Sequence, residues 1–436
     1  MKTKLVNHKS VNVITLGCAK NLVDSEFMLR QLKAAGFDIN HDTNAESDVI
    51  IINTCGFIND SKEESISAIL HWAEARKEGK VKQLYVMGCL SERYKDELRV
   101  EIPEADGFFG VNDLNALLQT LNAPFRKELL SERIITTPSH YAYLKISEGC
   151  DHKCSFCAIP SIRGKNISKP IDDIVREAEF LAASGVKEIM LIAQDLTYYG
   201  VDMNGKKQLP LLLEKLSEVK GIEWIRLHYA YPLGFPMEVL DVMKSGSKIC
   251  HYLDIPLQHI NNRILLSMKR GLNGDSTRKL IDKIRNKVPD IAIRTSLIVG
   301  YPGETAQEFN ELKQFVSDYK FERLGVFTYS HEENTPAYKL IDNVRPAIKA
   351  RRAEQLMTLQ QDISEQRNLL LHNQVLKVII DRKEEDLWIG RTEFDSPEVD
   401  NEVLISDPDN RLKPGIFVKV RITGSDMYDL NGVVES

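Results

Sequence analysis

Short apolar runs alternate with helix-patterned segments along most of the chain, and this alternation limits the folds that are available. In the first third, three runs have the composition of buried strands: Val11–Leu16, Asp48–Asn53 and Gln83–Met87. Helical spacing of apolar residues lies between them, over Asp24–Gly36 and from about Asp60 to Gly79, and this second segment opens with the pattern of a capping box, Asp60 to Glu63. Strands and helices that alternate with short connections predict a parallel α/β sheet.

A cysteine follows each of these three runs. Cys18, Cys55 and Cys89 stand just past the carboxyl ends of the predicted strands. Because the carboxyl ends of parallel strands share one edge of a sheet, the fold would gather these cysteines where ligands bind. One such cysteine is most simply a small buried hydrophobe. Three in equivalent positions favour a shared metal site.

A second series of strand–helix units begins at Tyr141. Its strand candidates are Ala142–Ile146, Glu188–Ala193, Trp224–Ala230, Tyr252–Pro256, Ala292–Val299 and Leu324–Tyr329. Helical patterns separate most of these runs, for example over Ile171–Ser184 and Ala306–Tyr319. Six such units predict a partial parallel barrel, (β/α)6, in which chemistry is placed at the carboxyl ends of the strands.

The first unit of this series leads into a C-x3-C-x2-C motif, formed by Cys150, Cys154 and Cys157. Three thiolates this close in sequence can bind one metal centre and leave it one position short of protein ligands. A zinc site with His152 as the fourth ligand is one interpretation. A four-iron cluster with one iron open to a further ligand is the favoured one, because zinc knuckles use C-x2-C pairs. Cys250, placed ahead of the predicted strand at Tyr252, is interpreted as structural.

Polar residues follow several later strands of the barrel. Gln194 and Asp195 come after the second strand, where they could line a ligand pocket or cap the next element. His228 and His259 are interpreted as hydrogen-bonded pocket or core residues rather than metal ligands. The stretch Gly300–Gly303 has the composition of a turn.

Charge and cysteine content narrow the cellular setting. The chain has 436 residues, a formal net charge of −6 and seven cysteines, which is an odd number. Its first ten residues are polar, and no apolar run approaches the about 18 residues of a membrane span. These features favour a cytoplasmic protein with reduced cysteines over a secreted disulfide framework or a membrane protein.

The final part of the chain predicts a long helix and a small antiparallel β-barrel. The helix covers Pro346–Leu371, and the strand patterns lie at Gln374–Asp381, Leu387–Arg391, Glu402–Ile405 and Phe417–Thr423. From His372 to Ser436 the chain carries fourteen acidic and eight basic residues. Nucleic-acid binding normally needs a basic surface, so nucleic acid is disfavoured and a basic protein partner is favoured. Acids that only keep the surface soluble are the alternative.

Several motifs match a known family. Cys150-x3-Cys154-x2-Cys157, with Phe156 beside the last cysteine, resembles the signature of the radical S-adenosylmethionine (SAM) superfamily. Thr15-Leu-Gly-Cys18-Ala-Lys-Asn21, Asn53-Thr-Cys55 and Gly88-Cys89 look like the N-terminal domain of the methylthiotransferases, and Arg163-Gly164 fits the same family. The C-terminal strands resemble its TRAM domain. On these motifs the chain is identified as a member of the radical SAM methylthiotransferase family.

The resemblance implies a transferase that uses SAM and two 4Fe-4S clusters. The cluster that cleaves SAM to a radical would be bound by Cys150, Cys154 and Cys157. The auxiliary cluster, which holds the sulfur, would be bound by Cys18, Cys55 and Cys89. The SAM pocket is predicted to include Phe156, Gln194 and Asp195. In the family one SAM methylates that sulfur and another yields the radical that activates the target carbon, so no side chain is expected to act as a catalytic acid or base.

Two stretches resemble the RimO-type branch, which modifies a ribosomal protein, more than the MiaB-type branch, which modifies tRNA adenosine. They are Trp224–Pro232 and Tyr252–His259. The RimO-type target is an aspartate of small-subunit ribosomal protein S-twelve, methylthiolated at its β-carbon, and tRNA is kept as the alternative substrate. A reducing electron donor and a sulfur source are implied as further partners. Asn334 stands where the family pattern has glycine, which puts the shape of that loop in doubt.

Three domains are expected from these matches. They are an N-terminal methylthiotransferase domain with the auxiliary cluster over residues 10–125, a radical SAM core with its connector helix over 136–368, and a TRAM domain over 369–436. The carboxyl edge of the first sheet is expected to face the open mouth of the barrel, so that both cysteine sets can act on one substrate.

Overall fold

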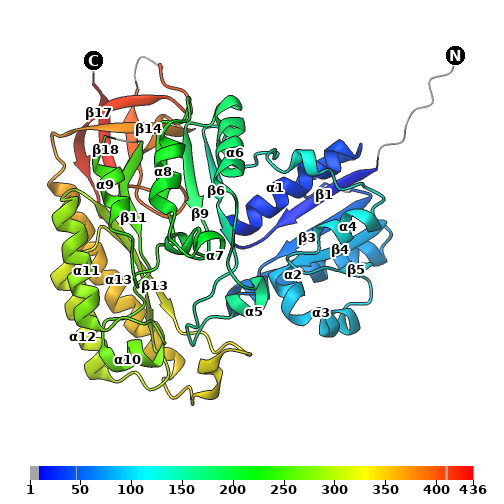
Figure 1. Ribbon diagram of the computed structural model, residues 1–436, viewed down its shortest axis with the longest axis horizontal. Coiled ribbons are helices and arrows are strands. Elements are labelled where there is room, and N and C mark those ends of the chain that lie inside the picture. Colours follow the sequence, from blue (N-terminus) through cyan, green and yellow to red (C-terminus); the bar gives the residue numbers. More distant parts are fainter. Residues whose placement is uncertain (1–8, 46, 247, 408–410, 436) are drawn as a thin grey trace. The chain divides into compact units, whose positions relative to one another are not determined.

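The computed structural model describes residues 9–45, 47–246, 248–407 and 411–435 (Figure 1). The chain divides into two compact units. The first comprises the chain up to Thr137 together with Glu148–His152 and Cys157–Asn166, and the second comprises Pro138–Ser147, Lys153–Phe156 and the chain from Ile167 onward. The first eight residues and Asp409, one of the fourteen C-terminal acids, lie outside the described residues.

The first unit contains a parallel α/β sheet, as the sequence predicts. The strand order is β2-β1-β3-β4-β5, and every pair is parallel. The strands are β1 (Ser10–Thr15), β2 (Asp38–His41), β3 (Val49–Thr54), β4 (Gln83–Gly88) and β5 (Gly107–Phe108). The helices are α1 (Ala19–Ala34), α2 (Asn59–Lys77), α3 (Cys89–Glu101), α4 (Leu114–Thr120), η1 (Lys127–Leu129) and α5 (Ile159–Arg163).

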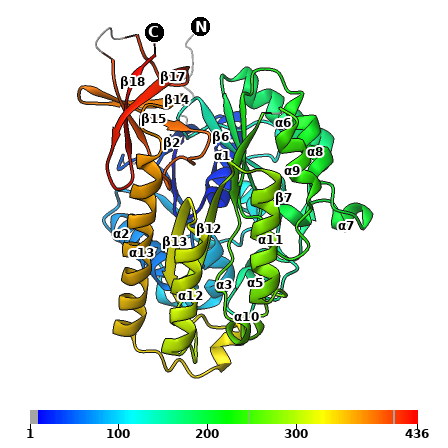
Figure 2. The ribbon, with the colours of Figure 1, turned by 90° about the vertical axis from the view of Figure 1, so that its left-hand side faces the viewer.

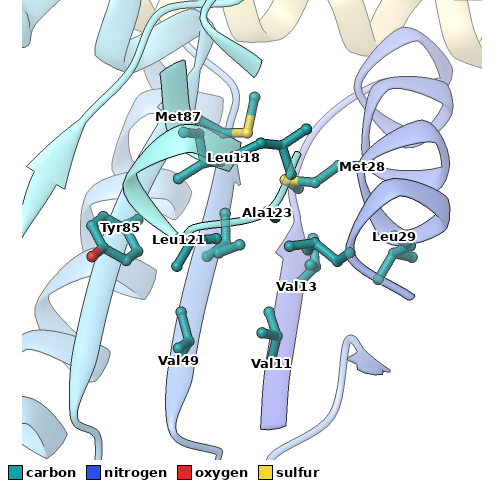
Figure 3. Close-up of a cluster of buried hydrophobic side chains, with 13 residues drawn as sticks. Val11, Val13, Met28, Leu29, Val49, Tyr85, Met87, Leu118, Leu121 and Ala123 are labelled. Atoms are coloured by element: carbon teal, nitrogen blue, oxygen red, sulfur yellow. The ribbon is translucent and has the colours of Figure 1, made fainter. Parts of the chain in front are cut away.

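Both faces of this sheet are buried, which explains why its central strand reads as one continuous apolar run. All six residues of β3 are buried. Val49 and Ile51 pack on one face with residues of α1 and α4, whereas Ile50 and Ile52 pack on the other face with residues of α2. Figure 3 shows the first of these clusters, with Met28 of α1 close to the strand side chains. Because helices cover both faces, the carboxyl edge of the sheet is left to the loops that carry the cysteines.

The second unit contains the predicted six-stranded parallel sheet. Its order is β13-β12-β11-β10-β9-β6. The strands are β6 (Tyr141–Lys145), β9 (Glu188–Ile192), β10 (Trp224–Leu227), β11 (Ile249–Asp254), β12 (Ala292–Val299) and β13 (Arg323–Thr328), and the short strands β7 (Ser147–Glu148) and β8 (Ile167–Ser168) form a separate pair. The connecting helices are α6 (Ile171–Ala183), η2 (Leu196–Tyr198), α7 (Val201–Asn204), α8 (Leu209–Ser217), α9 (Glu238–Lys244), α10 (Asn262–Ser267), α11 (Gly274–Lys287), α12 (Ala306–Tyr319) and η3 (Pro336–Lys339).

A long helix and a closed barrel complete the second unit. Helix α13 (Pro346–Leu369) runs beside β13 (Figure 2). The barrel order is β14-β15-β16-β18-β17, with β14 (Val375–Glu384), β15 (Leu387–Thr392), β16 (Val403–Ser406), β17 (Phe417–Ser425) and β18 (Leu430–Val434). Its pairs are antiparallel except for β16 with β18, which run parallel. In the part of the chain that is described, every helix is too short or too polar to cross a lipid bilayer.

A buried ion-pair network joins the parallel sheet to the C-terminal barrel within the second unit. Glu188 of β9 accepts hydrogen bonds from Arg226 of β10 at 2.7 Å and from Arg391 of β15 at 2.8 Å. Arg391 also donates to Asp381 of β14 at 2.6 Å, and His140 Nε2 lies 2.7 Å from the same carboxylate. Although burial opposes its ionisation, Arg391 and Arg226 lower the pKa of Glu188. Paired charges therefore hold the small barrel against the strands, and loss of one partner would leave the others buried without compensation.

Helix starts differ from the predictions in the first unit. Helix α1 begins at Ala19, five residues ahead of the predicted start, with Cys18 at its N-cap. The predicted capping box at Asp60 is wrong, because Ile58 is the N-cap of α2 and no side chain caps that end. Strands β2 and β18 were not predicted, since both are short and carry polar residues within the strand.

The doubtful loop at Asn334 keeps a glycine-like conformation. Asn334 has φ of 62°, in the left-handed region that glycine adopts freely and asparagine tolerates better than most residues. The 3-10 helix η3 follows directly after Thr335. The replacement of glycine is therefore compatible with the conformation that the family pattern requires.

Candidate metal centres and active site

The three cysteines of the first unit all lie at the carboxyl edge of its sheet. Cys18 is the N-cap of α1, Cys55 follows β3, and Cys89 is the first residue of α3 directly after β4. Gly17 allows Cys55 to come close to the loop that carries Cys18, because a Cβ on Gly17 would stand 2.5 Å from the Cβ and 2.8 Å from the Sγ of Cys55. Its φ of +91° is also one that only glycine adopts readily. The strand ends thus gather the three thiols, as the sequence predicts.

Asn21 fixes the loops around these cysteines. Its side-chain amide donates to the carbonyl of Leu16 at 2.9 Å and to that of Thr54 at 3.0 Å, which ties the ends of β1 and β3 together. Its side-chain oxygen lies 3.8 Å from the Sγ of Cys89. Asn21 is fully buried. The loops of all three cysteines therefore share one hydrogen-bonded centre.

Burial and helix ends act in opposite directions on these thiols. Burial raises the pKa of Cys55, and it raises the pKa of Cys89 to about 12 against the effect of the nearby Arg163 guanidinium. Cys18 and Cys89 stand at helix N-termini, where the helix dipole favours negative charge. Bound iron removes the protons from coordinating thiols outright. The buried thiols of Cys55 and Cys89 and the exposed thiol of Cys18, with no disulfide between them, fit the anionic ligand set of an iron–sulfur cluster.

Arg163 connects the exit of the C-x3-C-x2-C motif to this edge of the sheet. Its guanidinium is buried and donates to Asn21 Oδ1 at 2.5 Å, to Asp24 Oδ2 at 3.1 Å and to Glu148 Oε2 at 2.9 Å. Burial opposes its charge, but Asp24 and Cys89 raise its pKa above the ordinary value. A permanent positive charge therefore stands beside the auxiliary cysteine set.

The residues of α5 that precede Arg163 add an apolar contact to the same edge. Ala158 and Ile162 pack with Cys89 in one buried cluster, and Val111 packs against it. The backbone N–H of Cys150 donates to the carbonyl of Gly164 at 3.0 Å, which closes the motif loop on itself. Within the first unit, the segment that carries Cys150 and Cys157 is thus anchored to the strand end that carries Cys89.

Cys154, in contrast, belongs to the second unit. Its Sγ is buried, accepts from Arg270 Nη1 at 3.3 Å and lies 3.6 Å from the hydroxyl of Tyr231. Arg270 also stacks over the Tyr231 ring, 4.3 Å from its centroid. Arg270 thus supplies a charged donor to this sulfur, whereas the Tyr231 hydroxyl donates to the backbone carbonyl of Arg270 at 3.0 Å. Arg270 could not be identified from the sequence, because it lies 116 residues further along the chain than Cys154.

The six cysteines are all free of disulfides and suit iron–sulfur chemistry. Among the described residues, no group of three His, Cys, Asp or Glu side chains is arranged to hold a single metal ion. In a four-iron cluster each thiolate binds a different iron, so the ligands stand further apart than those of one ion. The gathered Cys18, Cys55 and Cys89 are compatible with that wider spacing.

The three residues predicted for the SAM pocket all lie in the second unit. Phe156 packs against a buried cluster that includes Tyr301 and Met268. Asp195 caps η2, since its Oδ1 accepts from the backbone and the hydroxyl of Thr197, both at 2.7 Å. Gln194 is half-buried at the end of β9. The structure thus assigns Asp195 a capping role, and the pocket role of all three residues stays a prediction.

The histidines and the Gly300 stretch have structural partners. His228 Nε2 lies 3.0 Å from Ser396 Oγ, and His259 lies 3.5 Å from Glu304. Glu304 also accepts from Arg352 of α13 at 3.0 Å. Gly300 has φ of +74°, and a Cβ there would stand 2.3 Å from the Lys349 side chain of α13. The stretch is therefore a turn clamped to α13, and the interpretation of both histidines as hydrogen-bonded core residues agrees with these contacts.

A parallel sheet whose first strand leads into a C-x3-C-x2-C loop defines a radical SAM protein. Residues 144–316 match the Radical SAM superfamily, residues 10–110 match Uncharacterized protein family UPF0004, and residues 374–434 match the TRAM domain. Among solved structures, the radical SAM methyltransferase TsrM of Kitasatospora setae is similar with a TM-score of 0.56 and 13% identity, over 76% of this chain and 74% of that chain. At this identity the likeness concerns the fold alone.

Full-length relatives identify the family. The chain is 54% identical to "Ribosomal protein uS12 methylthiotransferase RimO" of Flavobacterium psychrophilum, over 99% of both chains. It is 51% identical to the protein of that name in Cytophaga hutchinsonii over 100% of both chains, and 52% identical to that of Bacteroides thetaiotaomicron over 98% of both. The chain belongs to the RimO family of radical SAM methylthiotransferases. It is therefore an enzyme of the transferase class.

Proposed function

We propose that the chain transfers a methylthio group to the β-carbon of an aspartate in ribosomal protein uS12. The structural observation that supports this most is the anchoring of the motif segment, through Arg163 and α5, to the strand end that carries Cys89. A methylthiotransferase needs a radical centre and a sulfur-bearing centre that act on one substrate. A chain that ties segments of both cysteine sets together is built for such a reaction.

The cofactors of the family are SAM and 4Fe-4S clusters, and six of the seven cysteines divide into two sets of three. We assign Cys150, Cys154 and Cys157 to the cluster that binds SAM, and Cys18, Cys55 and Cys89 to the auxiliary cluster. When bound, SAM and the clusters supply the radical and the methylthio group.

The chain's own residues hold and tune these groups. Arg270 donates to the Cys154 sulfur and, with Tyr231 beside it, orients that side chain. Arg163 keeps a positive charge beside the auxiliary set, and Asn21 fixes the loops that present it. Phe156 is proposed to flank the SAM pocket together with Gln194 and Asp195. No side chain is needed as a general acid or base, because hydrogen abstraction by a carbon radical transfers proton and electron together.

The C-terminal barrel supports a protein substrate over tRNA. Its acidic excess repels phosphate and suits a basic ribosomal protein. Some of these acids already form ion pairs within the structure, such as Asp381 with Arg391 and Glu402 with Arg382. The acidic residues without such a pair are the ones available to a basic partner.

The cellular setting, the further partners and the domain bounds of the enzyme are proposed on the same grounds. The enzyme would work in the cytoplasm, take electrons from a reducing donor and take sulfur from a separate source. Its domains would span residues 10–125, 136–368 and 369–436. The carboxyl edge of the first sheet would face the mouth of the barrel when substrate is bound.

The test uses the full-length chain reconstituted with iron and sulfide. It is incubated with SAM and a reductant, together with purified uS12 or with tRNA, and the products are analysed by mass spectrometry. One methylthio group on an aspartate of uS12 is expected, and modification of tRNA alone would sink the proposal.

Variants with Cys18, Cys55 and Cys89 changed to Ala should still form 5′-deoxyadenosine but transfer no sulfur, whereas Cys154→Ala should do neither. Cys250→Ala serves as the matched control, because Cys250 packs in a buried cluster with Trp224 and Tyr252 and belongs to neither set.

A further inference from the structure

A cavity of about 420 Å³ lies in the second unit where β12, β13, α13 and the C-terminal barrel meet. Arg323 is the first residue of β13, so the cavity borders the amino end of that strand, whereas Cys154 follows the carboxyl end of β6. It is therefore a separate site from the candidate active site. Its lining comes from distant parts of the sequence, from Arg294 of β12 to Asp429 just ahead of β18.

Acidic groups outnumber basic ones in this lining. The carboxylates are Glu322, Glu398, Asp400, Glu402 and Asp429, and the guanidiniums are Arg294 and Arg323. Both arginines are already engaged, Arg294 at 3.7 Å from Asp400 and Arg323 at 2.9 Å from Asp395. Asp429 and Glu398 pair with no cation in the described part of the chain. Glu322 pairs with Arg285 and Arg367, and Glu402 pairs with Arg382, so the negative charge that the described residues leave uncompensated in the cavity lies on Glu398 and Asp429.

Two buried acceptors in the lining also lack a hydrogen-bond donor among the described residues. Gln360 is 3% exposed, its amide nitrogen donates to the carbonyl of Phe321 at 2.9 Å, and its Oε1 has no partner. The Asp400 side chain is 1% exposed, and its Oδ2 accepts from Tyr252 and from the Ser396 backbone, whereas its Oδ1 accepts no hydrogen bond. A buried acceptor without a donor is costly, so these oxygens favour a ligand that brings N–H groups.

Apolar side chains complete the walls. Leu324, Met357 and Val399 line the cavity beside the polar groups. Val399 and Tyr428 are exposed, which connects the lining to solvent. Lysine and arginine combine an apolar stem with a charged head that donates several hydrogen bonds, so they match both parts of this lining. Burial and the neighbouring Asp426 and Glu402 also raise the pKa of Asp429, which a bound cation would reverse.

We propose that this cavity binds a lysine or arginine side chain of the protein substrate, at a point away from the residue that is modified. The identity of the substrate rests on the proposed function, whereas the cationic nature of the ligand rests on the cavity alone. Binding energy gained at a site remote from the reacting carbon can be used to hold the target segment in place. The cavity would thus help to select a basic protein over tRNA.

Binding of fluorescently labelled uS12 to the full-length chain tests this inference. Gln360→Met removes the orphaned acceptor, and Asp429→Asn removes one uncompensated charge. Each is expected to raise the Kd about tenfold, as for loss of a hydrogen bond to a charged group. Asp386→Asn removes an exposed acid of the same barrel outside the cavity and should leave the Kd unchanged. Thermal unfolding of all variants identifies any that fail to fold.

A small probe separates this inference from the proposed function. L-arginine amide, titrated into the wild-type chain, should bind weakly, and the double variant of Gln360→Met and Asp429→Asn should lose that binding. Equal binding of uS12 by wild type and both single variants overturns the inference. Competition by spermidine but not by L-arginine amide also overturns it, because the site would then hold a free polyamine. If the wild type binds the probe but does not modify uS12, the proposed function fails and the cation site stands.

Discussion

At the scale of single residues, two features shape the carboxyl edge of the first sheet, where the three cysteines lie: the close packing at Gly17 and the buried charge of Arg163. Gly17 lets Cys55 approach the Cys18 loop, and Arg163 brings a charge that burial alone would disfavour. Both residues lie in motifs that the sequence singles out. Their partners could not be predicted, because the contact of Arg163 with Asn21 joins positions 142 residues apart.

Replacement of Gly17 by alanine should disrupt the auxiliary site. A Cβ would overlap the Cys55 side chain in a backbone conformation that alanine adopts poorly. Iron in the reconstituted chain is expected to fall from about eight to about four atoms per chain. Gly79→Ala is the matched control, since Gly79 also has positive φ but a Cβ there meets nothing within 4 Å. Equal iron content in both variants would show that the approach of Gly17 to Cys55 is unimportant.

Loss of the Arg163 charge should make the auxiliary cluster harder to reduce. Without the buried cation, an added electron is less stabilised, so Arg163→Met is expected to lower the midpoint potential by on the order of tens of millivolts. Arg163→Lys should restore part of the shift. Redox titration followed by electron paramagnetic resonance measures it, with the exposed Arg176→Met as control. An unchanged potential in Arg163→Met contradicts the assigned role.

At the scale of elements, apolar pattern predicted most strands and helices of both sheets. Strands β3 and β12 agree with their predicted ranges within a residue, because each carries a regular strand pattern: β3 is buried at every position, and β12 alternates buried and half-buried positions along most of its length. The edge strand β2 of the first sheet and the closing strand β18 of the barrel escaped prediction. Strand β18 closes the C-terminal barrel but has only five residues, with Asn431 and Gly432 inside it. Whether this segment forms a strand depends on its pairing with β16 and β17, and no local sequence pattern encodes that pairing.

The ion-pair network between β9, β10 and β15 should dominate the acid sensitivity of this interface. Glu188→Gln leaves Arg226 and Arg391 buried with weaker partners and is expected to cost ~3–5 kcal/mol in the free energy of unfolding near pH 7. The pKa of Glu188 is lowered in the folded chain, so its stabilisation is complete above the unfolded value of about 4.3 and is lost as pH falls through the lowered folded value.

Thermal unfolding across pH measures this effect. The difference in Tm between wild type and Glu188→Gln should be largest near neutral pH and should shrink in acid, as the wild type loses its advantage. Glu179→Gln, on the neighbouring helix α6 and exposed, is the control and should follow the wild type at every pH. A Tm difference that stays constant into strong acid would mean that the charge of Glu188 does not stabilise the interface.

At the scale of the whole molecule, the parallel-sheet rule predicted what matters most for function. Three cysteines 37 and 34 residues apart were expected to meet because each follows a parallel strand, and the structure brings them to one edge. The cation cavity was beyond prediction, because its lining is assembled from strands, a long helix and barrel loops that are far apart in sequence. The acidic excess of the C-terminal part predicted a negatively charged surface, but it did not predict where on the fold that charge would lie.

Mass spectrometry of uS12 from cells that lack this chain, and from the same cells after it is restored, tests the proposed function in its natural setting. The aspartate of uS12 is expected to carry no methylthio group in its absence and to regain the group with the wild-type chain. It should stay unmodified when Cys18, Cys55 and Cys89 are replaced by Ala. A methylthio group on uS12 in the absence of the chain, or its loss from tRNA instead, would contradict the assignment.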